Sequence, residues 1–207
     1  MADEDTGRDI WTPVGRSFYF NGEPKEKKGK DGPYQVWEGL LILDLDRFTE
    51  VDKALWASMC GKVNEISKVA FGKPWKDLPD NIRKGIRNGN ERPDSALYAG
   101  NTRFINVKSY FVPKLIAADK SILTPGTPAF AQYVYHGAYS RYKVRPKAYT
   151  FKDDNGITSK GINFTMLYAQ FFPGAEQVEQ GQTADDAPED DAWLTKASGE
   201  AIDDIGF

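Results

Sequence analysis

Cysteine and histidine are almost absent from this chain of 207 residues, which has one of each, Cys60 and His136. A single cysteine excludes an intramolecular disulfide, and the two residues together leave no credible zinc ligand set. Ser-His-Asp or Cys-His catalysis also fits poorly, because only His136 could serve as the imidazole base. We therefore expect Cys60 to fill space in the core, and we expect no enzymatic activity and no cofactor.

Long apolar runs and a glycine-rich phosphate loop are missing as well. No segment approaches the ~18 to 20 consecutive apolar residues of a membrane span, and the opening MADEDTGRDI lacks the basic and apolar regions of a signal peptide. The motif G-x-x-x-x-G-K-[ST] does not occur. We expect a cytosolic protein with no membrane partner, built as one domain with or without a tail.

Acidic residues are outnumbered by basic ones in most of the chain and are concentrated at its end. Residues 1–174 hold 26 Lys and Arg against 20 Asp and Glu, a net charge of +6, whereas residues 175–207 hold 1 against 10, a net charge of −9. The second segment also has too few apolar residues to offset the entropy lost on ordering it. We therefore predict a folded basic domain, 1–174, and a disordered acidic tail, 175–207.

The body has mainly the pattern of β-strands. Stretches rich in β-branched and aromatic residues occur at 11–20, 34–43, 102–112, 114–118, 137–151 and 160–172, with an Asp-Asn-Gly turn signal between the last two. One amphipathic helix is predicted between Thr49 and Phe71, capped by Thr49 with Asp52 and stopped at Gly72. Its predicted apolar stripe is Val51, Leu55, Met59, Val63, Ile66 and Ala70. This mainly β composition favours a small antiparallel barrel of the OB type.

The strand at 137–151 carries the most informative pattern. Strand alternation places four cations between two aromatic rings on one face: Tyr139, Arg141, Lys143, Arg145, Lys147 and Tyr149. Like charges along one face repel each other, and a polyanion would relieve that repulsion. Cations that neutralise phosphates, interleaved with rings on which bases stack, suit single-stranded nucleic acid. Exposed strands also carry Lys and Arg for solubility or edge protection, and that explanation stays open.

Two further segments add candidates. In the strand at 102–112, one face carries a ring, an amide, a cation and a second ring: Phe104, Asn106, Lys108 and Tyr110. Either face could be packed inward, and if Phe104 belongs to the core, Arg103 takes the outward role. The predicted exposed loop 21–33 holds lysines that either contact phosphate or mark a solvated hairpin tip: Lys25, Lys27, Lys28 and Lys30.

Several motifs around these strands resemble a known family. They are Arg92-Pro93-Asp94, Tyr98-Ala99-Gly100, Phe104, Asn106, Lys108 with Ser109, Val134, Gly137, Tyr139 with Arg141, and Lys160-Gly161-Ile162. In combination they are similar to the OB-fold single-stranded-DNA-binding proteins of tailed bacteriophages, over most of residues 12–172. The resemblance implies a replication or recombination accessory that coats exposed single strands in the cytoplasm of the infected bacterial host and has no catalytic activity. It adds Arg92 and Tyr98 to the DNA-binding candidates.

The final residues, DDIGF, carry a separate likeness. They are similar to the acidic tip of bacterial single-stranded-DNA-binding proteins, which docks onto replication and repair partners, although Gly206 stands where that tip has proline. The residues expected to contact a partner are Asp203, Asp204, Ile205 and Phe207, with the ring in an apolar pocket and the carboxylates against basic groups. The tethered anionic tail is also expected to compete with DNA for the basic face.

Alternatives remain open at this stage. The same barrel could bind duplex DNA or RNA, because phosphate contacts do not identify the polymer. The chain could also be a non-enzymatic structural or assembly protein of a phage, with a tail that aids solubility. A metal-dependent nuclease using Asp153, Asp154 and Glu91 is the weakest alternative, since DDNG is first a hairpin turn. The oligomeric state is open, with a homodimer among the options.

Overall fold

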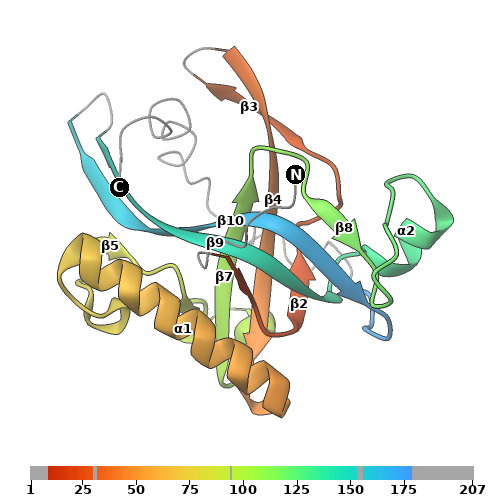
Figure 1. Cartoon of the computed structure of the whole chain (residues 1–207), viewed down its shortest axis with the longest axis horizontal. Helices are drawn as coiled ribbons and strands as arrows, with labels where there is room; N and C mark the ends of the chain where they lie inside the picture. The colour runs from red at the N-terminus through yellow and green to blue at the C-terminus, as the bar shows by residue number, and fades with distance from the viewer. Residues whose placement is uncertain (1–8, 30–31, 94, 153–155, 179–207) are drawn as a thin grey trace.

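Five strands form a closed barrel in the computed structural model, which describes residues 9–29, 32–93, 95–152 and 156–178 (Figure 1). They are β2 (Gly15–Phe18), β4 (Gly32–Asp44), β7 (Thr102–Ser109), β9 (Ala138–Lys152) and β10 (Thr158–Phe172). Around the ring the order is β2, β4, β7, β10 and β9, and β9 pairs again with β2. A five-stranded barrel of this kind is the OB architecture, so the predicted fold class is confirmed.

The barrel differs from an all-antiparallel one at β10. β7 and β10 run in parallel, with Thr165 beside Lys108, and two short strands, β5 (Ile82–Arg83) and β8 (Lys114–Ile116), also pair with β10 in parallel. Residue alternation sets which side chains share a face but not which strands become neighbours, so the sequence pattern did not reveal this pairing. The remaining short strands are β1 (Ile10–Trp11), β3 (Lys25–Gly29) and β6 (Arg87–Asn88).

The long helix α1 (Glu50–Phe71) lies beside the barrel and packs against β1 and β9 (Figure 1). The predicted capping box is confirmed: Thr49 accepts from the Asp52 backbone, and the Asp52 carboxylate accepts from Thr49 N at 3.2 Å. The helix ends at Gly72, whose φ of 73° is the left-handed conformation that glycine adopts readily. The buried Asp52 also accepts from Val14 N at 2.9 Å, which ties the helix start to the segment before β2.

The buried side of α1 is rotated from the predicted stripe. Met59 and Val63 are buried as expected, but Asp52 and Ser67 are buried too, while Val51 is 64% exposed and Ala70 is exposed. The bond from Asp52 to Val14 explains the rotation, because it turns that side of the first helical turn toward the barrel. Among the described residues, no helix is long and apolar enough to cross a membrane.

Cys60, on α1, is half-buried and packs against the main core, as expected of a residue that fills space. Burial raises the pKa of its thiol to about 11, against the lesser opposing effects of Lys76 and Arg103. The thiol is therefore neutral at physiological pH and a poor nucleophile.

Apolar side chains form two clusters. The main core fills the barrel interior, where Leu41, Ile105, Tyr142, Met166 and Phe171 are fully buried. The second cluster, which we call the outer cluster, consists of Phe18, Leu40, Ile42, Tyr98 and Phe104, and Tyr98 is contributed by the 3-10 helix η4 (Ala96–Tyr98). The other short helices are η1 (Leu45–Arg47), η2 (Trp75–Asp77), η3 (Gly89–Glu91) and α2 (Pro128–Tyr133).

The last described segment, residues 175–178, lies on the body of the protein. Val178 N donates to the His136 carbonyl at 3.0 Å, Tyr135 Oη donates to Ala175 O at 2.7 Å, and Arg16 donates to Glu176 O at 2.5 Å. Val178 also packs against the outer cluster. The start of the predicted tail is therefore attached to the domain, whereas residues 179–207, with Asp203, Asp204, Ile205 and Phe207, lie outside the described residues.

Candidate nucleic-acid interface

The alternation predicted for β9 is confirmed. Tyr142 and Val144 are fully buried in the barrel, whereas Arg145 and Lys147 are exposed and Arg141 is half-exposed. Since neighbouring positions point to opposite sides of a strand, the cations lie together on the outside of the barrel. We call this side of β9, with the side chains that adjoin it, the cationic face.

β10 extends the cationic face because it pairs with β9 along nearly its whole length. Directly opposed residues of an antiparallel pair point to the same side, and Tyr168 is opposite Lys143 while Gln170 is opposite Arg141. A bulge between Met166 and Tyr168 shifts the alternation by one residue. Thr165 on one side of the bulge and Tyr168 on the other therefore both belong to the cationic face.

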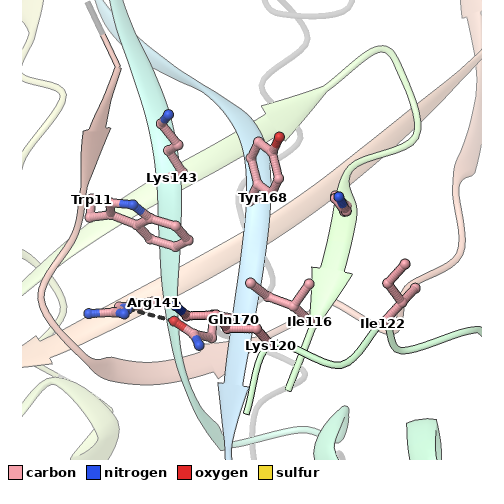
Figure 2. A pocket seen from close by; sticks show the side chains of 9 residues that line it. Trp11, Ile116, Lys120, Ile122, Arg141, Lys143, Tyr168 and Gln170 are labelled. Carbon is pink, nitrogen blue, oxygen red and sulfur yellow. Dashed lines mark hydrogen bonds between the residues drawn. The ribbon is translucent and has the colours of Figure 1, made fainter. Parts of the chain in front are cut away.

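Trp11 joins the face from β1. It is paired with Lys143, so its indole lies on the cationic side, whereas its neighbour Ile10 is buried (Figure 2). The Arg141 guanidinium carbon lies 5.0 Å from the Trp11 ring centroid and 5.7 Å from that of Phe172. Contacts of this length between a cation and an aromatic face are attractive and hold Arg141 in place.

Tyr168 gathers two more cations beside Trp11. Its ring centroid is 6.5 Å from that of Trp11, and the Lys143 and Lys114 ammonium nitrogens lie 5.9 Å and 5.8 Å from it. These side chains border a hollow of about 530 Å³, the Trp11 hollow (Figure 2). It is lined by Trp11, Lys114, Ile116, Lys120, Ile122, Arg141, Lys143, Tyr168 and Gln170.

Gln170 positions Arg141 at the wall of the Trp11 hollow. Its Oε1 accepts from Arg141 Nε at 2.9 Å, and its Nε2 donates to the carbonyls of Ala117 and Ala118 at 3.1 and 3.2 Å. Both ends of this amide are engaged by the protein, and Gln170 is only 4% exposed. The hollow therefore offers rings for stacking and cations for phosphate, a chemistry that does not distinguish one base from another.

Arg145 is compensated by an acidic neighbour. Asp9 accepts from its Nε at 2.7 Å and from its Nη2 at 3.2 Å, in a two-bond pair at the edge of the cationic face. The predicted role of Arg145 in binding phosphate therefore competes with an internal carboxylate. Lys147, further along β9, is exposed on the same face.

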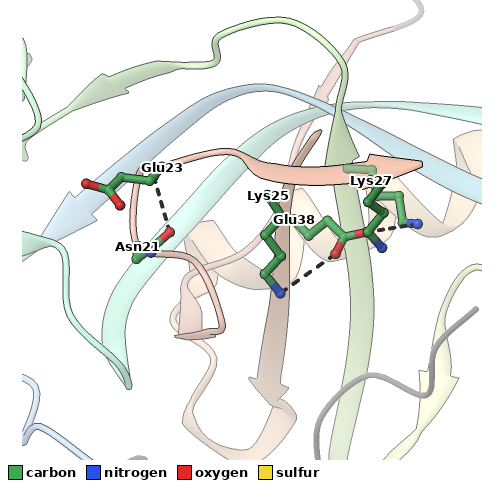
Figure 3. A network of polar contacts seen from close by, with 6 residues as sticks. Asn21, Glu23, Lys25, Lys27 and Glu38 are labelled. Carbon is green, nitrogen blue, oxygen red and sulfur yellow. Dashed lines mark hydrogen bonds and ion pairs between the residues drawn. The ribbon is translucent and has the colours of Figure 1, made fainter. Parts of the chain in front are cut away.

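Glu38 on β4 gathers three lysines. Its carboxylate lies 2.8 Å from Lys27, 2.9 Å from Lys108 and 3.8 Å from Lys25 (Figure 3 shows the two lysines of β3). Burial by itself would raise the pKa of Glu38, but the charges and hydrogen bonds of Lys108 and Lys27 outweigh burial and hold the pKa below its usual value.

The predicted loop 21–33 is in large part a hairpin arm, because β3 pairs with β4 from Lys25 to Gly29. The run of lysines hid this strand, since it lacks the β-branched and aromatic residues that identify strands. Two of the four candidate lysines are bound to Glu38. Lys28 is exposed, and Lys30 lies outside the described residues.

β7 supplies a second part of the outer surface. Lys108 is in register with Thr165, and alternation places Asn106 on the same side. These residues border a smaller hollow of about 40 Å³, the Asn163 hollow. It is lined by Arg83, Gly85, Arg87, Asn106, Lys108, Tyr110, Ile162, Asn163, Phe164 and Thr165.

Two predicted stacking residues are buried. Tyr98 and Phe104 are 3% and 2% exposed, pack edge to face at 5.0 Å in the outer cluster, and the Arg87 guanidinium covers Phe104 at 4.8 Å. Their rings do not offer a face to a base in this structure. The alternative in which Phe104 is packed away from solvent is therefore correct. Phe104 is covered because η4 folds over this part of the outer surface.

Arg103 does not replace Phe104 on the outside, because it points to the other side of β7. It donates to Asn88 Oδ1 at 3.3 Å and to the Thr102 carbonyl at 2.7 Å. Arg92 is half-buried in the segment between η3 and η4 and lines neither hollow. Tyr149 is half-exposed, and its hydroxyl lies where a side chain on Gly161 would be, 2.6 Å from the Cβ position, so glycine lets the tyrosine cross β10.

Sequence reasoning missed several members of the two hollows. The sequence analysis assigned no face along 160–172 and so did not single out Tyr168. Alternation continued from Asn163 would have selected Leu167, because the bulge cannot be read from the pattern. Trp11 belongs to a strand of two residues, too short for alternation to assign a face. Lys114, Arg83 and Arg87 come from short strands whose places beside β10 and β7 depend on the fold.

The residues of the nuclease alternative do not form a described site. Asp153 and Asp154 lie outside the described residues, and Glu91 binds Arg87 Nε at 2.8 Å and accepts from Asn88 N at 2.9 Å. In the described ranges, no group of three or more His, Cys, Asp or Glu is placed to hold a metal ion.

Comparison with known proteins gives a match at the level of structure. Neither a protein-family model nor a curated protein matches the sequence. Among solved structures, the single-stranded DNA-binding protein from bacteriophage Enc34 in complex with ssDNA superposes with a TM-score of 0.61 at 18% identity, covering 84% of this chain and 91% of that one. A second structure, of the single-stranded DNA-binding protein from bacteriophage Enc34, superposes with a TM-score of 0.60 at 17% identity. It covers 87% of this chain and 90% of that one. The chain therefore has the fold of a bacteriophage single-stranded DNA-binding protein.

Proposed function

We propose that this protein binds single-stranded DNA without regard to base sequence, across the cationic face of β9 and β10. The observation that carries the proposal is the Trp11 hollow, where Trp11 and Tyr168 stand among Arg141, Lys143 and Lys114. Stacking on such rings is worth about 1–3 kcal/mol per base and suits any base, while the cations neutralise phosphates.

The architecture supports oligonucleotide binding and extends the proposed surface beyond β9 and β10. OB barrels bind oligonucleotides on the outer face of their second and third strands and on the adjoining loops. Here these strands are β4 and β7, and β7 is the neighbour of β10 in the barrel. A structural neighbour with this fold is described in complex with ssDNA. Together with the sequence resemblance, this supports a phage accessory of DNA replication or recombination that acts in the cytoplasm of an infected bacterium and coats single strands without catalysing a reaction.

The binding experiment compares polymers and one matched pair of variants. Anisotropy of labelled oligo-dT is competed by unlabelled single-stranded DNA, duplex DNA and RNA of equal length, at ~50 and ~200 mM salt. We expect single-stranded DNA to compete best and the affinity to fall steeply with salt. Arg141→Ala should weaken binding by about tenfold, because it removes one cation that neutralises phosphate and the cation–π contact with the Trp11 ring. Lys53→Ala, which removes an exposed cation from α1, should stay within about twofold.

The competition also decides between the remaining candidates. Stronger competition by duplex DNA or by RNA would show that the cationic face binds that polymer in preference to single-stranded DNA. Indifference to all three at ~50 mM salt would contradict nucleic-acid binding and favour a structural role, since electrostatic binding is strongest at low salt. Equal losses of affinity in Arg141→Ala and Lys53→Ala would show that DNA does not bind at the cationic face.

The tail has two proposed roles that depend on this binding. Its net charge of −9 opposes the +6 of the body, and its first residues, up to Val178, lie on the body beside the outer cluster. A tethered polyanion competes with DNA at high effective concentration, and DNA in turn releases the tail. The released tip, with Phe207 and its flanking carboxylates, then recruits replication or recombination proteins.

A further inference from the structure

Asn163 has a buried polar group that the fold leaves unused. The residue lies on β10 opposite Lys147, on the cationic face. Its side-chain oxygen Oδ1 is buried and, within the part of the chain that the structure describes, has no hydrogen-bond partner. A buried acceptor that the protein leaves unpaired can accept a hydrogen bond from a donor outside the chain, either a water molecule or a ligand that displaces it.

The surroundings of Asn163 limit what can reach it. The Asn163 hollow, of about 40 Å³, has room for water-sized groups but not for a whole base. Its rim includes Tyr110, whose side chain is 44% exposed, and the cations Arg83 and Arg87. A base that lies against Tyr110 can therefore insert only its edge toward Asn163.

The missing partner must be a hydrogen-bond donor. Phosphate oxygens only accept, so a phosphate held by the rim cations leaves Oδ1 unsatisfied. Each of the four DNA bases carries at least one N–H on its Watson–Crick edge, and unstacked bases are read by proteins on that edge. In a duplex the same edge is covered by the complementary base.

We propose that Asn163 distinguishes unpaired from paired bases, with its Oδ1 accepting a hydrogen bond from a Watson–Crick N–H of a base stacked on Tyr110. This proposal rests on the proposed binding of single-stranded DNA and adds the residue that selects the unpaired state. Because every base offers such an N–H, the contact selects single strands without selecting a sequence.

The strand register supports this placement. Thr165, next to Asn163 on the same side of β10, is in register with Lys108 on β7 and with Arg145 on β9, while Asn163 itself is opposite Lys147. Cationic side chains thus flank the hollow on both neighbouring strands, with Lys108 also bound to Glu38 and Arg145 to Asp9. Phosphates on either side of an inserted base would lie near them.

The test combines one protein variant with one chemically modified DNA. Wild-type protein and Asn163→Leu are titrated with oligo-dT and with an oligomer in which every thymine carries a methyl group on N3, which removes its single Watson–Crick N–H. Wild type should bind the methylated oligomer about fivefold to tenfold more weakly, the worth of one hydrogen bond. Asn163→Leu should bind oligo-dT more weakly by a similar factor and should not discriminate between the two oligomers.

A second readout guards against a folding defect. Because Asn163→Leu removes an unsatisfied acceptor, its thermal midpoint should equal or exceed that of wild type. Should the variant fail to fold, the comparison of the two oligomers on wild type still tests the contact. Equal wild-type affinity for both oligomers, or equal discrimination by both proteins, overturns the proposal, whereas failure of wild type to bind oligo-dT overturns the proposed function.

Discussion

Arg141 combines the interactions on which the cationic face depends. Its guanidinium contacts the rings of both Trp11 and Phe172, and Gln170 holds its Nε. A lysine at this position would keep the charge but lose the planar group that stacks and donates in a fixed direction. The geometry of the guanidinium therefore contributes to binding beyond its charge.

Arg141→Lys tests that contribution. We expect its affinity for oligo-dT to fall by about threefold to fivefold, less than for Arg141→Ala, because phosphate attraction survives while stacking is lost. The slope of log affinity against log salt should match that of wild type, since the number of cations is unchanged. Anisotropy titrations at several salt concentrations measure both quantities, and a wild-type affinity would show that charge alone matters.

Glu38 gives a pH-dependent prediction. Its pKa is lower in the folded protein than the ordinary 4.5, so its stabilising effect is present above that pH and is lost as the pH falls through the folded value. Glu38→Gln should lower the free energy of unfolding at pH 7 by roughly 1–2 kcal/mol. The deficit should shrink as the pH falls below 4.5 and through the lowered pKa, as urea titrations of both proteins at pH 7 and at acidic pH would show. An equal deficit at both pH values would exclude the charge as its cause.

At the scale of elements, sequence patterns predicted those features that depend on neighbours along the chain. The cap of α1 at Thr49 and the alternation of β9 are local, and both were confirmed. The bulge before Tyr168, the parallel pair of β7 and β10, and the burial of Phe104 under η4 depend on distant segments. The cations of the site were therefore found more readily than its aromatic residues.

At the start of α1, the Asp52 side chain makes both a local contact within the helix cap and a contact with a distant segment. Asp52 caps the helix through Thr49 and also accepts from Val14 N. Asp52→Ala should lower the free energy of unfolding by about 2 kcal/mol, since it removes a cap and leaves the part-buried Val14 N–H unpaired. Glu50→Ala, in the same turn but exposed, should cost less than about 0.5 kcal/mol. Equal effects in denaturant titrations would show that the link to Val14 is unimportant.

At the scale of the whole molecule, the opposition of charge between body and tail predicts autoinhibition. Deleting residues 179–207 keeps Ala175, Glu176 and Val178 on the body and removes most of the acidic charge. The shortened protein should bind oligo-dT more tightly than the full chain at ~50 mM salt, and the gain should shrink at ~200 mM as salt screens the tail. Equal affinities at both concentrations would contradict autoinhibition.

The most direct test of the account is a fluorescence titration with oligo-dT, because stacking on Trp11 should quench its emission. We expect saturable quenching of the wild-type protein, and a clearly smaller amplitude together with weaker binding for Trp11→Leu. Wild-type binding without quenching, or a quenching amplitude that Trp11→Leu leaves unchanged, would contradict the assignment of the Trp11 hollow as the place where bases stack.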